Sequence, residues 1–475
     1  MAEMLFVFLH GRRVGTLRRA PGDGVEFRYD PDALEDISIS LPAGPNRVYS
    51  PNRASAFFNG LLPDGADARL RMARSLGSLD TSTYSLLSKA GLDCAGAVQV
   101  WVDDELPARY DALMPVDETR IGLRLRGLLD GVEGDESRGI NERWSLSGAQ
   151  SKIALRSEGG DWFIPLGNEP STHIIKPGVV GMQGVLPGDQ ALAEHVTMTA
   201  ARSLGVDVAM SFYFEFDGVP AIVVERFDRE RDSSHQLVRV HQEDMCQALG
   251  VGPAQKYEED GGPSAAGIGA LLREVASTPG QAQDDLWRFG LMVAFNYLAE
   301  APDAHAKNFS ILHTRAGLTR LAPMYDAATG AIASQPNSGQ RRFTKAAMGF
   351  GGTYLFGSAT PMHWGDFAQG LGLRDRESFV SSIRDMAAHL PDAFRDAIEH
   401  SGAPKGVRAR FVATGVLSRL NESAAAARVG AARQGASARL VGALPVSSAK
   451  AVCAEWMPRA KRRCALPKGH RGFHR

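Results

Sequence analysis

Residues 301–308 read A-P-D-A-H-A-K-N, and a Tyr-Asp pair at 325–326 follows them along the chain. The stretch places an acid, Asp303, five positions before an amide, Asn308, with a second acid, Asp326, further on. Transfer of a phosphoryl group uses such a set: one carboxylate orients the attacking hydroxyl, while an amide and a second carboxylate hold Mg²⁺ against a triphosphate. Taken alone, the spacing also fits a loop with a helix cap, where Asp and Asn are common. The neighbouring elements therefore decide between the two interpretations.

The elements around this stretch follow the order found at a protein-kinase catalytic loop. Residues 284–298 are apolar nearly all round and predict a buried helix that leads directly to Asp303. Residues 309–312 and 319–322 predict a β-hairpin, and Asp326 comes shortly after its second strand. A catalytic acid, a hairpin and a metal-binding acid, in that order, are typical of kinases.

The composition is that of an ordinary globular protein of two or three domains, with 475 residues, 44% hydrophobic and 23% charged. A net charge of −1 gives no overall attraction to nucleic acid or to an anionic membrane. Four cysteines are too few for a disulfide framework and favour a reducing cytoplasm. The apolar run at 4–9 predicts a strand rather than a signal peptide, and the run around 289–299 is too short to span a bilayer. We therefore expect a cytoplasmic protein without membrane contact.

The first hundred residues predict a small α+β unit with no cluster of reactive side chains, and hence a structural or docking role. Its predicted strands are 4–9, 13–17, 25–29 and 97–102, and its predicted helices are 50–62 and 66–76.

A second group of short strands is predicted at 152–156, 162–165 and 173–176. The loop before them, W-S-L-S-G-A-Q-S-K at 144–152, can offer backbone N–H groups to phosphates, although its single glycine also fits a plain turn. Lys176 ends the third strand, where a kinase lysine contacts the α- and β-phosphates. The helix predicted at 190–204 carries Glu194, which is either the partner of that lysine or an exposed helix charge.

A hairpin of residues 211–216 and 220–225 closes this β-rich part, and Glu225-Arg226-Phe227 follows where a small lobe would pass to a large one. Backbone groups at such a hinge can bind adenine edges. Beyond residue 227 the pattern is mostly helical, with an apolar stripe at Phe379, Ile383, Met386 and Leu390 that predicts core.

Several separated motifs occur in one order along the chain: R-V-G-T-L (13–17), F-F-N-G-L-L-P-D (57–64), S-G-A-Q-S-K (147–152), T-H-I-I-K (172–176), V-E-R-F-D-R (224–229), Q-E-D-M-C-Q (242–247), K-Y-E-E-D-G-G-P (256–263), D-A-H-A-K-N (303–308) and Y-D (325–326). Together they resemble the HipA family of serine/threonine kinases, the toxins of bacterial type II toxin–antitoxin modules. The resemblance runs from about residue 4 to residue 425. One departure is Ala304, where the family often has glycine, which affects only the local backbone.

The resemblance implies an α+β fold with two kinase-like lobes: a small β-rich lobe with an extra N-terminal α+β subdomain, and a mostly helical large lobe. It implies that Asp303 is the catalytic base, that Asn308 and Asp326 bind Mg²⁺, and that Glu194 pairs with Lys176. The residues implied to bind ATP are Ser147, Gly148, Ala149, Gln150, Ser151, Lys152, Lys176, Glu225, Arg226, Phe227, His305, Ala306, Lys307, Asn308, Tyr325 and Asp326.

The resemblance also implies autoregulation through phosphorylation of Ser145, with Ser147 as a second candidate hydroxyl. A phosphoserine adds close to two negative charges, which would compete with ATP for the same N–H groups and for Lys176. We expect this modification to expel the loop and disable the kinase.

The implied partners are a HipB-like helix-turn-helix antitoxin, operator DNA reached through that antitoxin, and a protein substrate in translation, typically an aminoacyl-tRNA synthetase whose phosphorylation arrests growth. Two alternatives stay open: a kinase-like enzyme that phosphorylates a small molecule or a lipid headgroup, and a non-catalytic protein that binds an antitoxin. A self-phosphorylating loop serine favours the protein kinase over an enzyme that acts on a small molecule or lipid. Retention of the polar site residues argues against a non-catalytic protein; they are Lys176, Asp303, Asn308 and Asp326.

We expect four segments: an N-terminal subdomain at 1–110, the small lobe at 111–227, the large lobe at 228–444 and a basic tail at 445–475. The tail holds Cys453, Cys464, His470 and His474, a complete set of tetrahedral Zn²⁺ ligands, although the two cysteines are further apart than in common zinc motifs. A basic tail without metal is the alternative.

Overall fold

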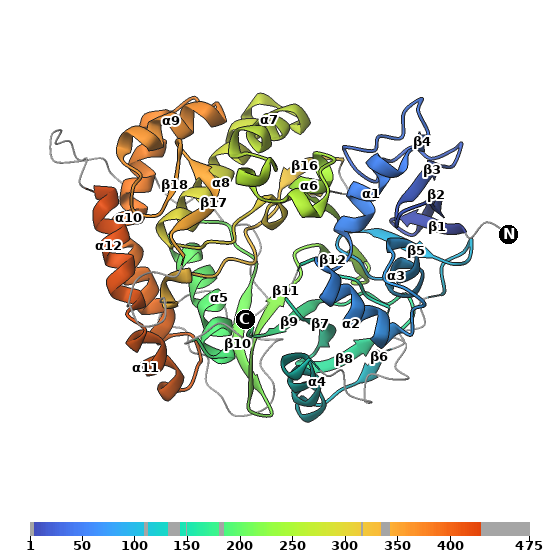
Figure 1. The fold of residues 1–475 in the computed structure, drawn as a ribbon, viewed down its shortest axis with the longest axis horizontal. Coiled ribbons are helices and arrows are strands. Elements are labelled where there is room, and N and C mark those ends of the chain that lie inside the picture. The colour runs from blue at the N-terminus through green and yellow to red at the C-terminus, as the bar shows by residue number, and fades with distance from the viewer. Residues whose placement is uncertain are drawn as a thin grey trace.

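The computed structural model describes residues 4–108, 113–131, 143–148, 150–179, 185–314, 317–333 and 343–428. These residues form an N-terminal α+β unit, a small lobe built on a β-sheet, and a large lobe made mostly of helices (Figure 1). The chain therefore mixes helix and sheet as predicted. The predicted tail, with Cys453, Cys464, His470 and His474, lies outside the described residues.

The N-terminal unit is an antiparallel sheet in the order β4-β3-β2-β1-β5, with α1 and α3 packed against it and α2 packed against α3. Its first hairpin turns at His10 and Gly11, which both have positive φ (52° and 79°), the backbone that suits a two-residue hairpin turn. Phe27, Phe57 and Phe58 are fully buried between sheet and helices. The elements are β1 (Met4–Leu9), β2 (Arg12–Arg19), β3 (Val25–Tyr29), β4 (Val48–Tyr49), β5 (Val98–Trp101), α1 (Pro51–Gly60), α2 (Ala66–Leu76) and α3 (Thr83–Ala90).

The small lobe is a six-stranded sheet in the order β10-β11-β9-β7-β8-β6, buried on both faces. Successive residues of a strand point to opposite faces. Accordingly, Ile222 and Val224 of β11 join the core around α5, whereas Ala221 and Val223 join the core around α4. This explains the continuous apolar run of β11. The elements are α4 (Glu118–Asp130), α5 (Pro187–Ser203), β6 (Leu113–Pro115), β7 (Ile153–Glu158), β8 (Asp161–Pro165), β9 (His173–Pro177), β10 (Ser211–Phe216) and β11 (Val219–Glu225).

The large lobe is organised around α8 (Pro279–Leu298), whose last turns are buried. The helix leads into residues 301–308, the predicted catalytic loop, which we call the catalytic stretch. The predicted apolar stripe lies in α10 (Arg376–Glu399), and its four residues are all buried, which confirms that it is core. None of the described helices is long and apolar enough to cross a lipid bilayer. The other elements are α6 (Met245–Ala248), α7 (Ala265–Val275), α9 (Pro361–Leu371), α11 (Lys405–Ala413), α12 (Val416–Arg428), the sheet β14 (His241–Asp244), β15 (Ser310–His313) and β16 (Thr319–Leu321), and the pairs β12 (Arg229–Arg231) with β13 (Leu237–Arg239) and β17 (Lys345–Phe350) with β18 (Thr353–Leu355).

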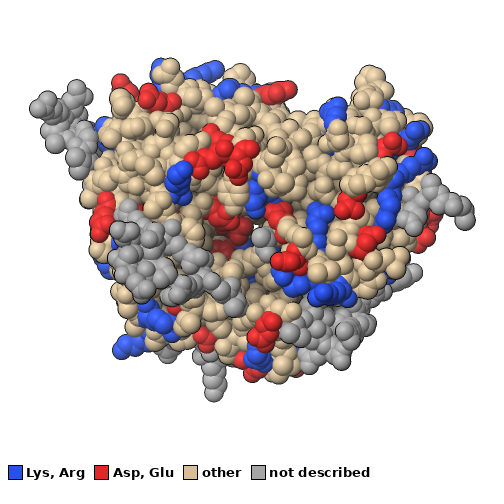
Figure 2. Space-filling model, in the orientation of Figure 1, with Lys and Arg blue, Asp and Glu red and all other residues tan. Residues whose placement is uncertain are grey.

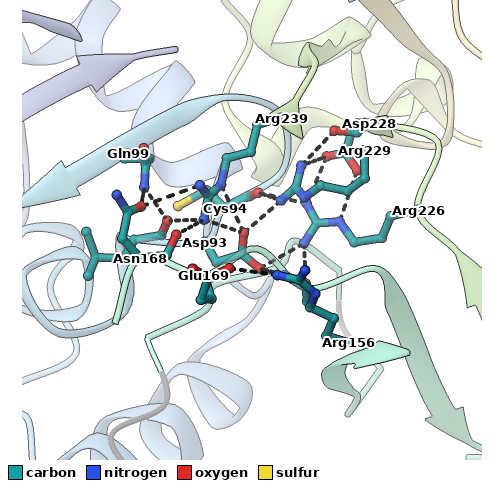
Figure 3. A network of polar contacts seen from close by, with 12 residues as sticks. Asp93, Cys94, Gln99, Arg156, Asn168, Glu169, Arg226, Asp228, Arg229 and Arg239 are labelled. Carbon is teal, nitrogen blue, oxygen red and sulfur yellow. Dashed lines mark hydrogen bonds and ion pairs between the residues drawn. The ribbon is translucent and has the colours of Figure 1, made fainter. Parts of the chain in front are cut away.

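A buried network of charged groups joins the N-terminal unit to the two lobes (Figure 3). Asp93, which precedes β5, accepts hydrogen bonds from Arg229 at 2.8 Å, Arg239 at 3.2 Å and Arg226 at 3.4 Å. Arg226 also donates two bonds to Asp228 at 2.9 and 2.8 Å. Burial raises the pKa of Asp93, but the three arginines outweigh it and hold the pKa well below its usual range. We call these five residues the junction network; their charges are paired with one another.

Candidate active site

A cavity of about 760 Å³ lies where the small lobe, the large lobe and the N-terminal unit meet. In Figure 2 this face of the molecule is hollowed near its centre, with acidic side chains along the rim. The catalytic stretch, the end of β9, helix α5 and the hinge after β11 all contribute to its wall, and Gly60 and Asp64 reach it from the N-terminal unit.

Most of the predicted nucleotide-binding residues line this one cavity. They are Ser147, Gly148, Gln150, Lys152, Lys176, Glu225, Arg226, Phe227, His305, Lys307, Asn308, Tyr325 and Asp326, together with Asp303 and Glu194. Ser145, Ser151 and Ala306 are not among the described residues that line it. Ala149 lies outside the described residues.

Lys176 occupies the centre of the charged cluster. Its Nζ lies 2.8 Å from Glu194 Oε1 on α5 and 2.5 Å from Asp326 Oδ1. Burial lowers the pKa of Lys176, but the two carboxylates outweigh it and raise the pKa above its usual range. Burial likewise raises the pKa of Asp326, and the two lysines beside it outweigh this and lower it. Burial also raises the pKa of Glu194. At neutral pH the cluster therefore holds a fixed ammonium between the Asp326 carboxylate and the Glu194 side chain.

Asn308 ties the two acidic segments together. Its amide Nδ2 donates to the Asp303 carbonyl oxygen at 2.7 Å and to the Asp326 carbonyl oxygen at 3.5 Å. Asp326 has φ 57°, a left-handed backbone that is uncommon outside glycine and recurs at functional sites. The amide nitrogen is thus used within the protein, which leaves the amide oxygen as the group that can face a cation.

The side chains present fit a magnesium site of the phosphoryl-transfer kind. Among the described residues, no three His, Cys, Asp or Glu side chains gather into a self-contained metal site. Mg²⁺ in such enzymes is held by one or two carboxylates and by the substrate phosphates rather than by an all-protein cage. Asp326 and Asn308 offer one carboxylate and one amide oxygen, which suits a cation that arrives with its nucleotide.

The predicted phosphate loop runs beside the N-terminal unit. Gly148 has φ 106°, a backbone conformation that glycine adopts without the strain a side chain would add. Its carbonyl oxygen accepts the Asp64 N–H at 3.2 Å. Lys152 donates to the Ser147 carbonyl oxygen, and burial together with the neighbouring Lys176 charge lowers the pKa of Lys152 to about 8. Unlike Lys176, this lysine loses its proton within an accessible pH range.

The hinge residues divide between structure and pocket. The N–H groups of Glu225 and Arg226 donate to the Met210 and Thr172 carbonyl oxygens, each at 2.9 Å. The Arg226 guanidinium belongs to the junction network. Phe227 packs its ring against Tyr325, with centroids 5.4 Å apart. The backbone N–H groups of Glu225 and Arg226 are thus used within the protein, and Phe227 lines the cavity beside them.

Sequence reasoning gave no role to three further residues of the cavity wall: Asp64, Tyr257 and Asp244. Asp244 Oδ2 lies 3.2 Å from Lys307 Nζ, and Asp64 Oδ1 lies 3.7 Å from the same atom. Lys307 is therefore held by protein carboxylates. The signal for these residues was present in the motifs at 57–64, 242–247 and 256–263, but nothing local in them indicates which site they join.

Two family models match the chain: the HipA N-terminal domain over residues 5–101 and the HipA-like C-terminal domain over residues 144–394. The second match alone spans more than half of the 475 residues. Y4mE of Sinorhizobium fredii, which is named as a kinase, is 36% identical over 339 residues, 68% of this chain and 76% of that protein. HipA of Shewanella oneidensis, named as a serine/threonine-protein kinase toxin, is 28% identical over 364 residues, 73% of this chain and 78% of that protein.

A solved complex of Shewanella oneidensis HipA, HipB and operator DNA contains a similar chain, with a TM-score of 0.72 and 25% identity over 89% of this chain and 97% of the matched one. This match confirms the predicted two-lobed, kinase-like fold with its additional N-terminal unit. The chain therefore belongs to the HipA family of serine/threonine-protein kinase toxins.

Proposed function

We propose that this protein is an ATP-dependent kinase that phosphorylates serine or threonine hydroxyls of a protein, and that Asp303, Lys176, Asn308 and Asp326 carry the reaction. One observation supports this above all. Lys176 joins Glu194 and Asp326 in the cavity that Asp303 and Asn308 also line, although these side chains come from separate parts of the chain. Unrelated polar side chains from distant parts of the chain would not be expected to line the same cavity.

The roles follow from the chemistry of each side chain. ATP with Mg²⁺ supplies the phosphoryl group. Asp303, whose side chain is 65% exposed, is open to accept the proton of a substrate hydroxyl. Lys176 keeps its charge at neutral pH and can bind phosphate oxygens, while Glu194 fixes its position. Asp326 and Asn308 would hold the cation through a carboxylate and an amide oxygen.

The experiment is phosphoryl transfer from γ-labelled ATP to a bacterial lysate, with Asp303→Asn as the matched control. We expect labelled protein bands with the natural protein and none with the variant. Label that enters only small molecules or lipids would identify the alternative enzyme, and the absence of any transfer would favour the non-catalytic antitoxin-binding protein.

The proposed substrate is a protein of translation, and an aminoacyl-tRNA synthetase is the first to test. The proposal rests on membership of the family, and mass spectrometry of the labelled bands examines it. Bands without any translation protein would contradict this part while leaving the kinase activity intact.

We further propose self-inactivation through Ser145. Its hydroxyl is fully buried and donates to the Leu61 carbonyl oxygen at 2.7 Å. The loop would have to leave its place for Ser145 to be phosphorylated, and a group with close to two charges could not return to a buried position. Ser145→Ala should stay active during prolonged incubation with ATP, while the natural protein gains one phosphate by intact mass and slows. If Ser147→Ala alone prevents the modification, Ser147 is the site.

The proposed partners are a HipB-like helix-turn-helix antitoxin and, through it, operator DNA. The matched complex of Shewanella oneidensis HipA, HipB and operator DNA supports this proposal. Co-expression with a neighbouring helix-turn-helix protein, followed by gel-shift assays on its upstream DNA, provides the test. A stable complex that shifts DNA only when the antitoxin is present is the expected result.

We also propose that the chain divides into domains at residues 110, 227 and 444.

A further inference from the structure

Tyr257 contacts the proposed catalytic acid directly. Its hydroxyl donates a hydrogen bond to Asp303 Oδ1 at 2.6 Å. Burial and the Asp303 carboxylate both raise the pKa of Tyr257, so the phenol keeps its proton and remains a donor at neutral pH. Hydrogen bonds to ionised carboxylates are short and strong. This contact therefore fixes an acid whose side chain is largely exposed.

The same segment, residues 256–257, holds the catalytic stretch at two further points. The Ala306 N–H donates to the Lys256 carbonyl oxygen at 3.2 Å. The Tyr257 ring lies edge-on to His305, with centroids 5.1 Å apart. Backbone, ring and hydroxyl contacts thus fall on residues 303 to 306, and together they fix the direction in which the stretch presents its acid.

The N-terminal unit anchors this segment. Asp64, which follows α1, pairs with Lys256 Nζ at 3.0 Å, and the two side chains are only 11% and 15% exposed. A pair this shielded from solvent is weakly screened by salt. The Asp64 N–H also bonds the Gly148 carbonyl oxygen. A line of contacts therefore runs from the N-terminal unit through Lys256 and Tyr257 to Asp303, with a branch to the phosphate loop.

The contacts on Asp303 orient its carboxylate and do not block the approach of a substrate hydroxyl. Tyr257 and His305 both approach Oδ1, at 2.6 and 3.8 Å. Burial lowers the pKa of His305, so its ring is neutral at neutral pH and forms no ion pair with Asp303. A substrate hydroxyl needs only one carboxylate oxygen, and Oδ2 is the one that we assign to it.

We propose that Tyr257 is a positioning residue for phosphoryl transfer: it holds one oxygen of the Asp303 carboxylate so that the other meets the substrate hydroxyl, and Asp64 of the N-terminal unit anchors it through Lys256. This inference rests on the proposed kinase function. An unrestrained exposed carboxylate samples several rotamers, and a fixed one spends more time in the reactive geometry.

The test compares Tyr257→Phe with the natural full-length protein, using Mg²⁺–ATP and a dephosphorylated bacterial lysate as phosphoacceptor. The variant loses only the hydroxyl. We expect the rate at saturating ATP to fall about tenfold, equivalent to about 1.4 kcal/mol of transition-state stabilisation, with the KM for ATP changed less than about twofold. The thermal unfolding midpoint should be unchanged. Tyr354→Phe, a tyrosine outside the cavity wall, is the control and should behave as the natural protein.

A second variant tests the anchor. Asp64→Asn should lower the rate in the same direction, and the double variant Asp64→Asn, Tyr257→Phe should lose no more than the larger of the two single losses, because both act on Asp303 through one path. If the rate losses of the two single variants multiply in the double variant, Asp64 does not act on Asp303 through Tyr257.

The outcomes separate this inference from the function beneath it. A Tyr257→Phe protein as fast as the natural one rejects positioning, and a faster one shows that the tyrosine blocks the acid. A rise in the KM for ATP with an unchanged rate at saturating ATP assigns Tyr257 to ATP binding instead. If the natural protein transfers no phosphate, or Asp303→Asn transfers it undiminished, the proposed function itself fails and the inference fails with it.

Discussion

The junction network and the active-site cavity both gather charged side chains, but they leave those charges in different states. In the junction network, Asp93 and Asp228 are surrounded by arginines that donate to them from several directions. In the cavity, Asp303 is largely exposed, Lys152 donates to a backbone carbonyl oxygen, and Asp326 has a left-handed backbone.

The difference distinguishes charged groups that stabilise the fold from charged groups that are available to bind a ligand. A buried ion pair that satisfies its own donors and acceptors is costly to break, yet it has nothing left to offer a substrate. A site that binds a triphosphate and a cation must keep donors and carboxylates available, and it does so at the expense of local stability. Arg226 and Phe227 are adjacent at this boundary: the Arg226 guanidinium belongs to the junction network, and the Phe227 ring packs against Tyr325.

The largest expected effect is on activity, from Asp303→Asn. The change keeps the shape of the side chain but removes its ability to accept a proton, so phosphoryl transfer should fall about 10²- to 10⁴-fold. The initial rate of label transfer measures this. Because the side chain is exposed, the free energy of unfolding should change by less than about 1 kcal/mol. A variant that loses both activity and stability would place Asp303 among the structural charges.

Asp93→Asn should give the opposite result at the junction network. Three arginines lose the charge of their shared partner, so the free energy of unfolding should fall by about 3–5 kcal/mol in urea denaturation. The folded state lowers the pKa of Asp93, so the stabilisation is present at neutral pH and is lost as the pH falls below the usual range of a carboxyl. Acidification should therefore destabilise the natural protein more steeply than the variant. Parallel pH curves would contradict this account.

Lys152 should produce a pH effect of intermediate size on ATP binding. Its pKa of about 8 means that the ammonium is lost as the pH rises through that value, whereas Lys176 stays charged. The KM for ATP should rise several-fold between about pH 7 and pH 9, and Lys152→Arg, which cannot lose its charge there, should flatten that rise. An identical pH profile in Lys152→Arg would show that Lys152 is not the group that titrates.

The same pKa shift predicts the pH dependence of stability. The unfolded chain keeps its Lys152 proton up to the ordinary lysine range, so it binds more protons than the folded protein above about pH 8. Lys152 therefore makes the natural protein gain stability as the pH rises through this window. Urea denaturation of the natural protein and Lys152→Met, compared at pH 7 and pH 9, checks the sign.

Arg126→Ala should have the smallest effect and serves as the control for Asp93→Asn. Arg126 pairs with Asp217 at 2.6 Å, but the two side chains are 39% and 45% exposed. Exposed pairs contribute about 0–1 kcal/mol, so unfolding in urea should shift by no more than that and activity should stay the same. A loss comparable to that of Asp93→Asn would mean that burial does not explain the difference between the two pairs.

The local sequence pattern predicted those elements in which the spacing of apolar residues and the flanking turn residues indicate the same structure. The strand at Met4–Leu9, the helix at Ala66–Leu76 and the strand at Ser211–Phe216 have the predicted bounds. The helices Thr83–Ala90 and Glu118–Asp130 were not predicted. In the second, Ile121, Leu125 and Leu128 lie at helical spacing and belong to the core against the sheet, so the pattern for this helix was present in the sequence and was missed.

The sequence by itself determined which side chains are available for chemistry: the order of motifs led to the HipA family, and the spacing of Asp303, Asn308 and Asp326 marked the catalytic stretch. Only the tertiary structure decided which of them line the cavity and which are taken up by other groups of the protein. Arg226 turns away from the predicted hinge into the junction network, and Tyr257 and Asp64 reach the site from 46 and more positions away. The physical reason is that ion pairs and hydrogen bonds join atoms that folding brings together, and separation along the chain carries no information about those distances.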